Sequence, residues 1–138
     1  MSVRLAWLAA VIVSACLLAP ALARDLGQWS KTDPELSMWF QSLRQPDNPQ
    51  ISCCGEADSY WADDVRVERD SDGNAIVVAT VTDTRPDEPL GRVHVPPGTR
   101  IIIPPHKITW KHGNPTGHTI VFLGAQQQLF CFIQAGGV

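Results

Sequence analysis

The hydrophobic positions between residues 36 and 43 recur at helical spacing. They are Leu36, Trp39, Phe40 and Leu43, and they form one apolar face. Asp33 is a typical helix-capping residue, Pro34 suits the first turn, and Glu35 lies close to the positive end of the helix dipole. Proline at positions 46 and 49 ends the pattern. The sequence therefore predicts one amphipathic helix over about residues 33–44.

From Tyr60 onward the pattern changes to that of β-strands. Val65 and Val67 alternate with polar residues, the acidic turn 70–74 follows, and residues 75–82 are rich in Val, Ile and Thr, which predicts a hairpin. Further strands are predicted at 92–95, at 100–103 and at 106–112, where Ile108 and Trp110 would share one side. Residues 119–123 and 128–134 are strongly apolar and would lie centrally.

These elements predict a mainly β (α+β) fold. A Pro-rich loop at 83–91 and many Pro/Gly turns separate short strands, which is typical of a small antiparallel sheet, an open barrel or a sandwich. The N-terminal helix would pack on that sheet. Residues 24–138 are long enough for a single domain with one core.

The first 23 residues have the pattern of a secretory signal. A short positive segment, 1–4, precedes an apolar run, 5–18, and a small-x-small cleavage site at 21–23. An alternative is a lipid anchor at Cys16, although the sequence stays apolar after that residue. No later segment is long and apolar enough to span a membrane. We therefore expect a periplasmic or extracellular protein with no transmembrane segment in its mature part.

Three cysteines remain after the signal: Cys53, Cys54 and Cys131. An oxidising compartment favours a disulfide, and a bridge between adjacent cysteines would require a strained ring. We expect Cys131 to pair with Cys53 or with Cys54, and the sequence leaves that choice open. Closing a loop of nearly eighty residues would contribute about 4 kcal/mol.

Charge is distributed unevenly along the chain. All 14 acidic residues precede Pro89, and all 4 histidines follow it. The formal net charge of −3 argues against general nucleic-acid binding. The carboxylate-free second half offers a possible face for an anion or a partner, formed by Arg100, Lys107, Lys111, His112 and His118. The alternative is that these cations pair with the acidic first half of the same chain.

Three short motifs together resemble an uncharacterised family of small secreted proteobacterial proteins. They are the vicinal pair Cys53-Cys54 followed by Gly55, the turn Asn114-Pro115-Thr116-Gly117, and the late Cys131-Phe132. The likeness covers about residues 50–135. It implies secretion and a cysteine-tethered β domain, and it implies no established activity.

Motifs that would identify a reaction are missing from the sequence. It has no GxSxG nucleophile elbow, no CxxC and no HExxH. We therefore expect a non-enzymatic binding or interaction module whose partner is a protein or a small anionic ligand. The alternative is an accessory protein that binds copper or zinc, with Cys54 and His118 as candidate ligands.

Overall fold

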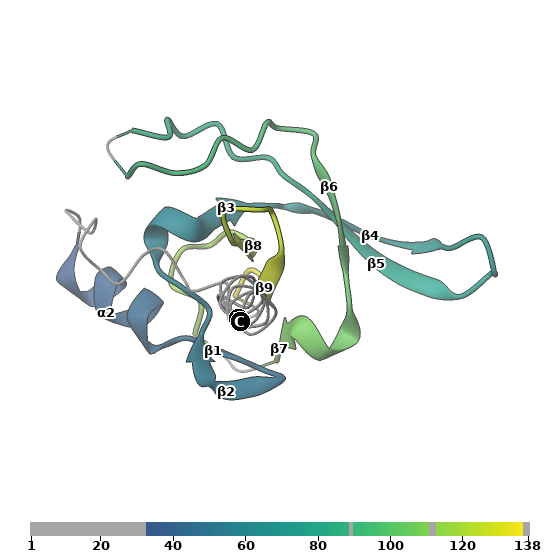
Figure 1. Cartoon of the computed structure of the whole chain (residues 1–138), viewed down its shortest axis with the longest axis horizontal. Helices are drawn as coiled ribbons and strands as arrows, with labels where there is room; N and C mark the ends of the chain where they lie inside the picture. The colour runs from purple at the N-terminus through teal and green to yellow at the C-terminus, as the bar shows by residue number, and fades with distance from the viewer. Residues whose placement is uncertain (1–32, 89, 111–112, 137–138) are drawn as a thin grey trace, which may run out of the picture.

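The computed structural model describes residues 33–88, 90–110 and 113–136. The predicted signal at 1–23, the lipid-anchor alternative at Cys16, and two of the predicted anion-binding residues, Lys111 and His112, lie outside these ranges. Within these ranges the chain is mainly β, with one α-helix and small sheets that do not close into a barrel; Figure 1 shows their arrangement. The predicted fold class is confirmed.

The helix α2 (Pro34–Ser42) begins where the sequence predicts. The side chain of Asp33 accepts a hydrogen bond from the backbone N–H of Glu35 at 2.8 Å, and Pro34 occupies the first turn. The apolar face of α2 points inward, and Phe40 on that face is only 3% exposed.

In the described ranges, nine short strands follow the helix. They are β1 (Arg44–Gln45), β2 (Asn48–Ser52), β3 (Ser59–Trp61), β4 (Asp64–Arg69), β5 (Ala75–Thr80), β6 (Arg100–Ile103), β7 (Ile108–Thr109), β8 (Ile120–Leu123) and β9 (Leu129–Ile133). One sheet has the order β3-β8-β9-β7, a second has the order β4-β5-β6, and β1 pairs with β2. All pairs are antiparallel except β7 with β9. Single turns of 3₁₀-helix occupy Glu56–Asp58 and Pro105–Lys107.

The strand β8 is buried on both of its faces, which explains its continuous apolar sequence. Val121 and Leu123 point to a core shared with the β4-β5-β6 sheet. Ile120 and Phe122 point the other way, to a second core under α2 that contains the disulfide cysteines. The period of two along the strand therefore divides the apolar residues between two layers.

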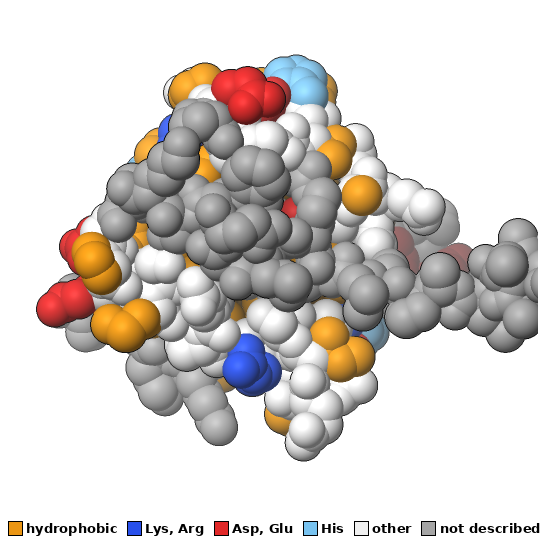
Figure 2. All heavy atoms as spheres, turned by 60° about the vertical axis from the view of Figure 1, so that its left-hand side comes forward, with side chains coloured by type: hydrophobic (Ala, Val, Ile, Leu, Met, Phe, Trp, Pro, Cys, Tyr) orange, Lys and Arg blue, Asp and Glu red, His pale blue; other side chains and the backbone are white. Residues whose placement is uncertain are grey.

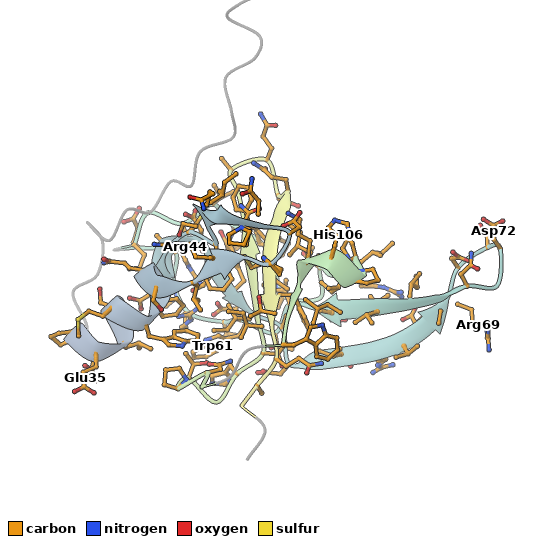
Figure 3. All side chains as sticks on the ribbon, turned by 90° about the horizontal axis from the view of Figure 1, so that it is seen from below. Glu35, Arg44, Trp61, Arg69, Asp72 and His106 are labelled. Carbon is orange, nitrogen blue, oxygen red and sulfur yellow. A yellow bond between two sulfur atoms is a disulfide. The ribbon has the colours of Figure 1, made fainter. Side chains whose placement is uncertain are left out.

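The β4–β5 hairpin extends away from the rest of the molecule in Figure 1. Figure 3 places Asp72 at its tip, at the end of the long axis opposite Glu35 on α2. The carboxylate of Asp70 accepts hydrogen bonds from the backbone N–H groups of Asp72 and Asn74, at 2.9 and 2.8 Å, and so closes the predicted acidic turn.

Two predicted strands differ from the structure. Residues 92–95 are not in a strand. Arg92 turns inward and forms an ion pair with Asp83, and Val95 packs in the core that β8 shares with the β4-β5-β6 sheet. Within the described part, 106–110, of the predicted strand 106–112, only β7 is a strand, since the turn at Pro105–Lys107 uses the backbone of the first residues. Ile108 is buried and Trp110 is exposed, so the two residues do not share a buried side.

Candidate functional site

The predicted disulfide is confirmed, and its partner is Cys53. The Sγ atoms of Cys53 and Cys131 are 2.02 Å apart, and their Cα atoms are separated by 5.5 Å. Cys54 is buried beside them but is not part of the bridge. The backbone N–H of Cys54 donates to Oγ of Ser52 at 3.0 Å, and its φ of +84° turns the chain into the following 3₁₀ turn.

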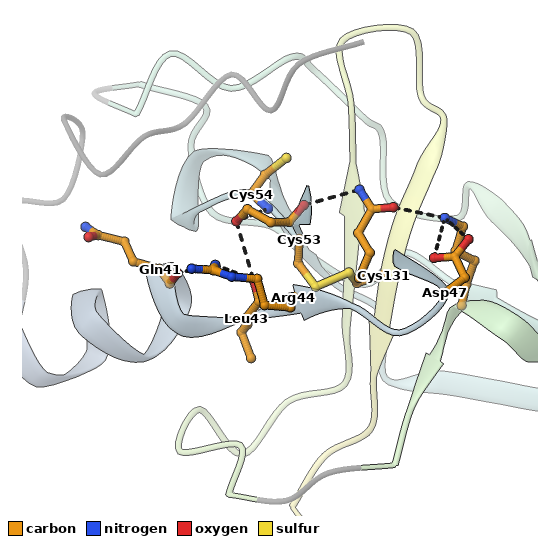
Figure 4. Close-up of a disulfide and its surroundings, with 10 residues drawn as sticks. Gln41, Leu43, Arg44, Asp47, Cys53, Cys54 and Cys131 are labelled. Carbon is orange, nitrogen blue, oxygen red and sulfur yellow. Dashed lines mark hydrogen bonds and ion pairs between the residues drawn. A yellow bond between two sulfur atoms is a disulfide. The ribbon is translucent and has the colours of Figure 1, made fainter. Parts of the chain in front are cut away.

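The disulfide fixes the β1–β2 hairpin to the strand β9 (Figure 4). Close to the bridge, the N–H of Cys53 donates to the carbonyl of Leu43 at 3.1 Å. The side-chain amide of Gln45 donates to the carbonyl of Ser52 at 3.2 Å. The segment between the end of α2 and Cys53 is therefore held on the core by one covalent link and several hydrogen bonds.

A groove of about 600 Å³ runs between this segment and β7. One wall comes from the end of α2 and the β1–β2 hairpin, and the other comes from β7 and the residue after it. Its lining residues are Trp39, Ser42, Leu43, Arg44, Gln45, Pro46, Pro49, Ile108, Thr109 and Trp110. We call it the Trp groove. Its volume is in the range of small-molecule sites, and most of its lining is apolar.

An ion pair joins the two walls of the Trp groove. Nζ of Lys107, directly before β7, lies 2.8 Å from a carboxylate oxygen of Asp47 and 3.1 Å from the side-chain oxygen of Gln45. The hydrogen bond from Lys107 lowers the pKa of Asp47. Because Asp47 and Gln45 belong to the hairpin and Lys107 to the opposite wall, this contact sets the distance between the walls.

The two indoles of the groove differ in how they are held. The ring of Trp39 packs edge-to-face on Phe40, with centroids 4.9 Å apart. Trp110 is 71% exposed. In the part of the chain that the structure describes, neither indole N–H donates a hydrogen bond to the protein. Both indoles can therefore offer a ring face and a donor to another molecule.

A second polar cluster fixes the loop 83–95 against β3. The carboxylate of Asp83 is 2.7 Å from Nη1 of Arg92 and 2.7 Å from Nη2 of Arg85. It also accepts the backbone N–H of Trp61 at 3.2 Å. Burial would raise the pKa of Asp83, but the hydrogen bonds from Arg85 and Arg92 outweigh it and hold that pKa well below its usual value.

Next to this cluster, three side chains form a stack at the edge of the sheet. The ring of His118 stacks on Trp61 with centroids 3.9 Å apart, and the guanidinium of Arg85 lies 4.2 Å from the indole centroid. Nδ1 of His118 is 2.8 Å from a carboxylate oxygen of Asp63. A smaller pocket of about 340 Å³ lies under the same loop, and Asp83, Arg85, Arg92 and His94 are among its lining residues.

The described members of the predicted anion-binding face each lie beside a carboxylate of the first half. Arg100 is 2.6 Å from Glu68, Lys107 is 2.8 Å from Asp47, and His118 is 2.8 Å from Asp63. Figure 2 shows one face of the molecule, with an acidic side chain beside a histidine at the top and a basic side chain near the lower edge. The charge asymmetry of the sequence thus corresponds, at these three positions, to pairing within the chain.

The candidate metal ligands occupy different environments. Cys54 lies in the core under α2, and His118 lies in the turn before β8. Among residues 33–88, 90–110 and 113–136, no group of three or more His, Cys, Asp or Glu side chains is placed to hold a metal ion. The same residues contain no helix of the length and apolarity needed to cross a membrane.

Sequence reasoning did not predict the Trp groove. Trp39 was assigned to the buried face of the helix and Trp110 to a strand face, and no local pattern relates residues 39–49 to residues 108–110. The only indication in the sequence was the pair of prolines, Pro46 and Pro49, which interrupt the chain next to Trp39.

Comparisons of the chain with protein-family models, with curated proteins and with solved structures found no match. The resemblance to a family of small secreted proteins stays a prediction.

Proposed function

We propose that the protein is a small, non-enzymatic binding module of a periplasmic or extracellular compartment, and that the Trp groove is its ligand site. The observation that carries this proposal is the pair of tryptophans in one groove of about 600 Å³, of which Trp110 is 71% exposed. Exposing a large aromatic side chain forgoes roughly 2 kcal/mol of burial free energy, which a bound molecule can recover.

The groove is also built to keep its shape. The disulfide holds the hairpin wall on β9, and the Lys107–Asp47 contact joins that wall to β7. A site whose walls are fixed before binding loses less conformational freedom when a ligand enters, which favours affinity. The disulfide is also the kind of bond that persists in an oxidising compartment, and this supports the proposed location.

The proposal can be tested by recovering the ligand with the protein. The oxidised protein, purified from its native compartment under gentle conditions, is analysed by native mass spectrometry for bound small molecules. We expect a bound species in the wild type and at least tenfold less of it in Trp110→Ala, because the exposed indole contributes ring contact.

The matched control is Ile102→Ala, which removes another exposed apolar side chain from β6, outside the groove lining. This variant should retain the bound species at the wild-type level. Equal retention by all three proteins, or a bound species that Trp110→Ala does not affect, would contradict the assignment of the groove.

A further inference from the structure

We infer that the ligand of the Trp groove is a small amphipathic carboxylate, with a flat apolar body between the two indoles and its carboxylate at Arg44. This inference rests on the proposed function, which assigns the groove, and it adds the chemical class of the ligand. It depends on the charge, the geometry and the hydrogen-bonding groups of the lining residues.

Arg44 differs from most other cations of the structure. Among the Lys and Arg side chains that the structure describes, only Arg44 and Arg69 have no described carboxylate within ion-pair distance. Arg69 lies on the protruding hairpin, where its guanidinium donates to the carbonyl of Gly73. Arg44 lines the groove, and none of the described lining residues is an aspartate or a glutamate. The groove therefore contains one cation whose charge no acidic side chain of the described chain compensates.

Hydrogen bonds hold the guanidinium of Arg44 in place. Its Nη1 donates to the carbonyls of Gln41, at 2.8 Å, and Leu43, at 3.1 Å, at the end of α2 (Figure 4). Within the described residues, Nη2 and Nε donate to no protein acceptor, so they can meet the two oxygens of a carboxylate side by side. A fixed fork of this kind is selective for a planar anion.

Lys107, the other cation next to the groove, does not compete for the ligand's charge. Its ammonium group already contacts Asp47 and Gln45, and its side chain is only 16% exposed. The anionic end of a ligand is therefore directed to Arg44 and away from the opposite wall.

The remaining lining residues specify the body of the ligand. Trp39, Trp110, Leu43 and Ile108 offer apolar contact, and the prolines of the hairpin add to it. A further polar group is present: Oγ1 of Thr109 is buried and has no hydrogen-bond partner in the structure. A buried hydroxyl without a partner is uncommon in proteins, and a polar group on the ligand would satisfy it.

These features favour a small acid over a neutral sugar. A sugar could stack on the indoles but would leave the charge of Arg44 without a counter-ion. A small acid with a fused-ring or similarly flat body satisfies the guanidinium and the indoles at the same time, within a volume of about 600 Å³.

The inference is tested with two probes of equal shape, 2-naphthoate and its neutral analogue 2-naphthamide, titrated into the oxidised protein by calorimetry. We expect 2-naphthoate to bind about tenfold more tightly than 2-naphthamide, because only the carboxylate forms charge-assisted hydrogen bonds. Arg44→Gln should remove this difference and leave the affinity for 2-naphthamide within about twofold of wild type. Arg69→Gln, which removes the other cation without an ion pair, should change neither affinity.

A thermal unfolding curve of each variant confirms that it is folded. If Arg44→Gln does not fold, Arg44→Lys replaces it. That variant keeps the positive charge but loses the fork, so part of the preference for the carboxylate should remain.

Equal affinity of the wild type for the two probes, with both affinities lost in Trp110→Ala, would overturn the inference while the proposed function stands. A preference for 2-naphthoate that persists unchanged in Arg44→Gln would also overturn it. If neither probe binds and no bound species is recovered with the purified protein, the inference and the proposed function fail together.

Discussion

Replacing Asp83 with alanine tests whether the buried ion cluster of the loop 83–95 stabilises the fold. The side chain of Asp83 is 1% exposed and that of Arg92 is 2% exposed. After the substitution, the guanidinium of Arg92 still contacts the carbonyls of Ser59, at 3.2 Å, and Arg85, at 2.7 Å. It also keeps a longer ion pair with the partly exposed carboxylate of Asp87, at 3.6 Å, but it loses its close, buried counter-charge. The N–H of Trp61 also loses its acceptor.

Removing one partner of a buried ion pair costs about 3–5 kcal/mol where the other charge stays buried without compensation, and here Asp87 compensates Arg92 in part. We therefore expect Asp83→Ala to lower the free energy of unfolding by about 3 kcal/mol, at the lower end of that range. A small domain has roughly 5–15 kcal/mol in total, so this variant should be strongly destabilised. The assay is urea denaturation of the oxidised protein followed by circular dichroism, with the slope m compared to confirm that the same transition is measured.

The matched control is Asp64→Ala. Asp64 also pairs with an arginine, Arg66, at 2.8 Å, but the two side chains are 40% and 70% exposed. An exposed pair of this kind contributes about 0–1 kcal/mol. If Asp83→Ala costs no more than Asp64→Ala, the reasoning from burial is wrong.

A combined variant separates the cost of an unpaired charge from a loss of packing. Asp83→Leu with Arg92→Met replaces both partners of the buried pair by apolar side chains of similar size. Such replacements are often neutral or stabilising, so the double variant should be at least about 2 kcal/mol more stable than Asp83→Ala. A double variant as unstable as Asp83→Ala would indicate that the specific hydrogen bonds, and not the uncompensated charge, dominate.

The remaining predictions concern pH and the disulfide. The pKa of Asp83 is lowered in the folded state, so its contribution to stability is complete well above the ordinary pKa of 3.8 and is lost as the pH falls below it. Urea denaturation at a series of pH values should show this loss in the wild type and a shallower slope in Asp83→Ala; equal slopes would contradict it. Cys131→Ser should lower the free energy of unfolding by about 2–5 kcal/mol, since the bridge closes a long loop. Cys54→Ser should retain the bridge, as peptide mapping of the unreduced protein can show, and a Cys54–Cys131 peptide in the wild type would refute the assignment.

Several features of this protein were predictable from local sequence. Asp33-Pro34 begins the helix because a capping carboxylate and a proline act within a few residues of where they stand. The apolar run that forms β8 was predicted as a central strand, because a strand that is covered on both faces buries consecutive apolar side chains. A bridge to Cys131 was also predictable, because a disulfide between the adjacent Cys53 and Cys54 would require a strained ring.

Other features depended on contacts between distant parts of the chain. Cys53 and Cys54 are neighbours of the same type, so only the direction of each side chain in the packed core decides which of them meets Cys131. Residues 92–95 have the composition of a strand, yet the ion pair of Arg92 with Asp83 gives this segment an irregular path. The disulfide and the ion pair each join residues that lie in different segments, and the hydrophobic pattern of neither segment indicates its partner.

The sequence by itself therefore determined the helix, most of the strands and the existence of a covalent link, because periodicity, capping and turn chemistry act over a few residues. The tertiary structure decided the pairing of Cys53, the pairing of basic residues in the second half with acids in the first, and the Trp groove between residues 39–49 and 108–110. These arrangements result from the packing of the helix and the sheets on shared cores, where long-range contacts compete and no single segment specifies the outcome.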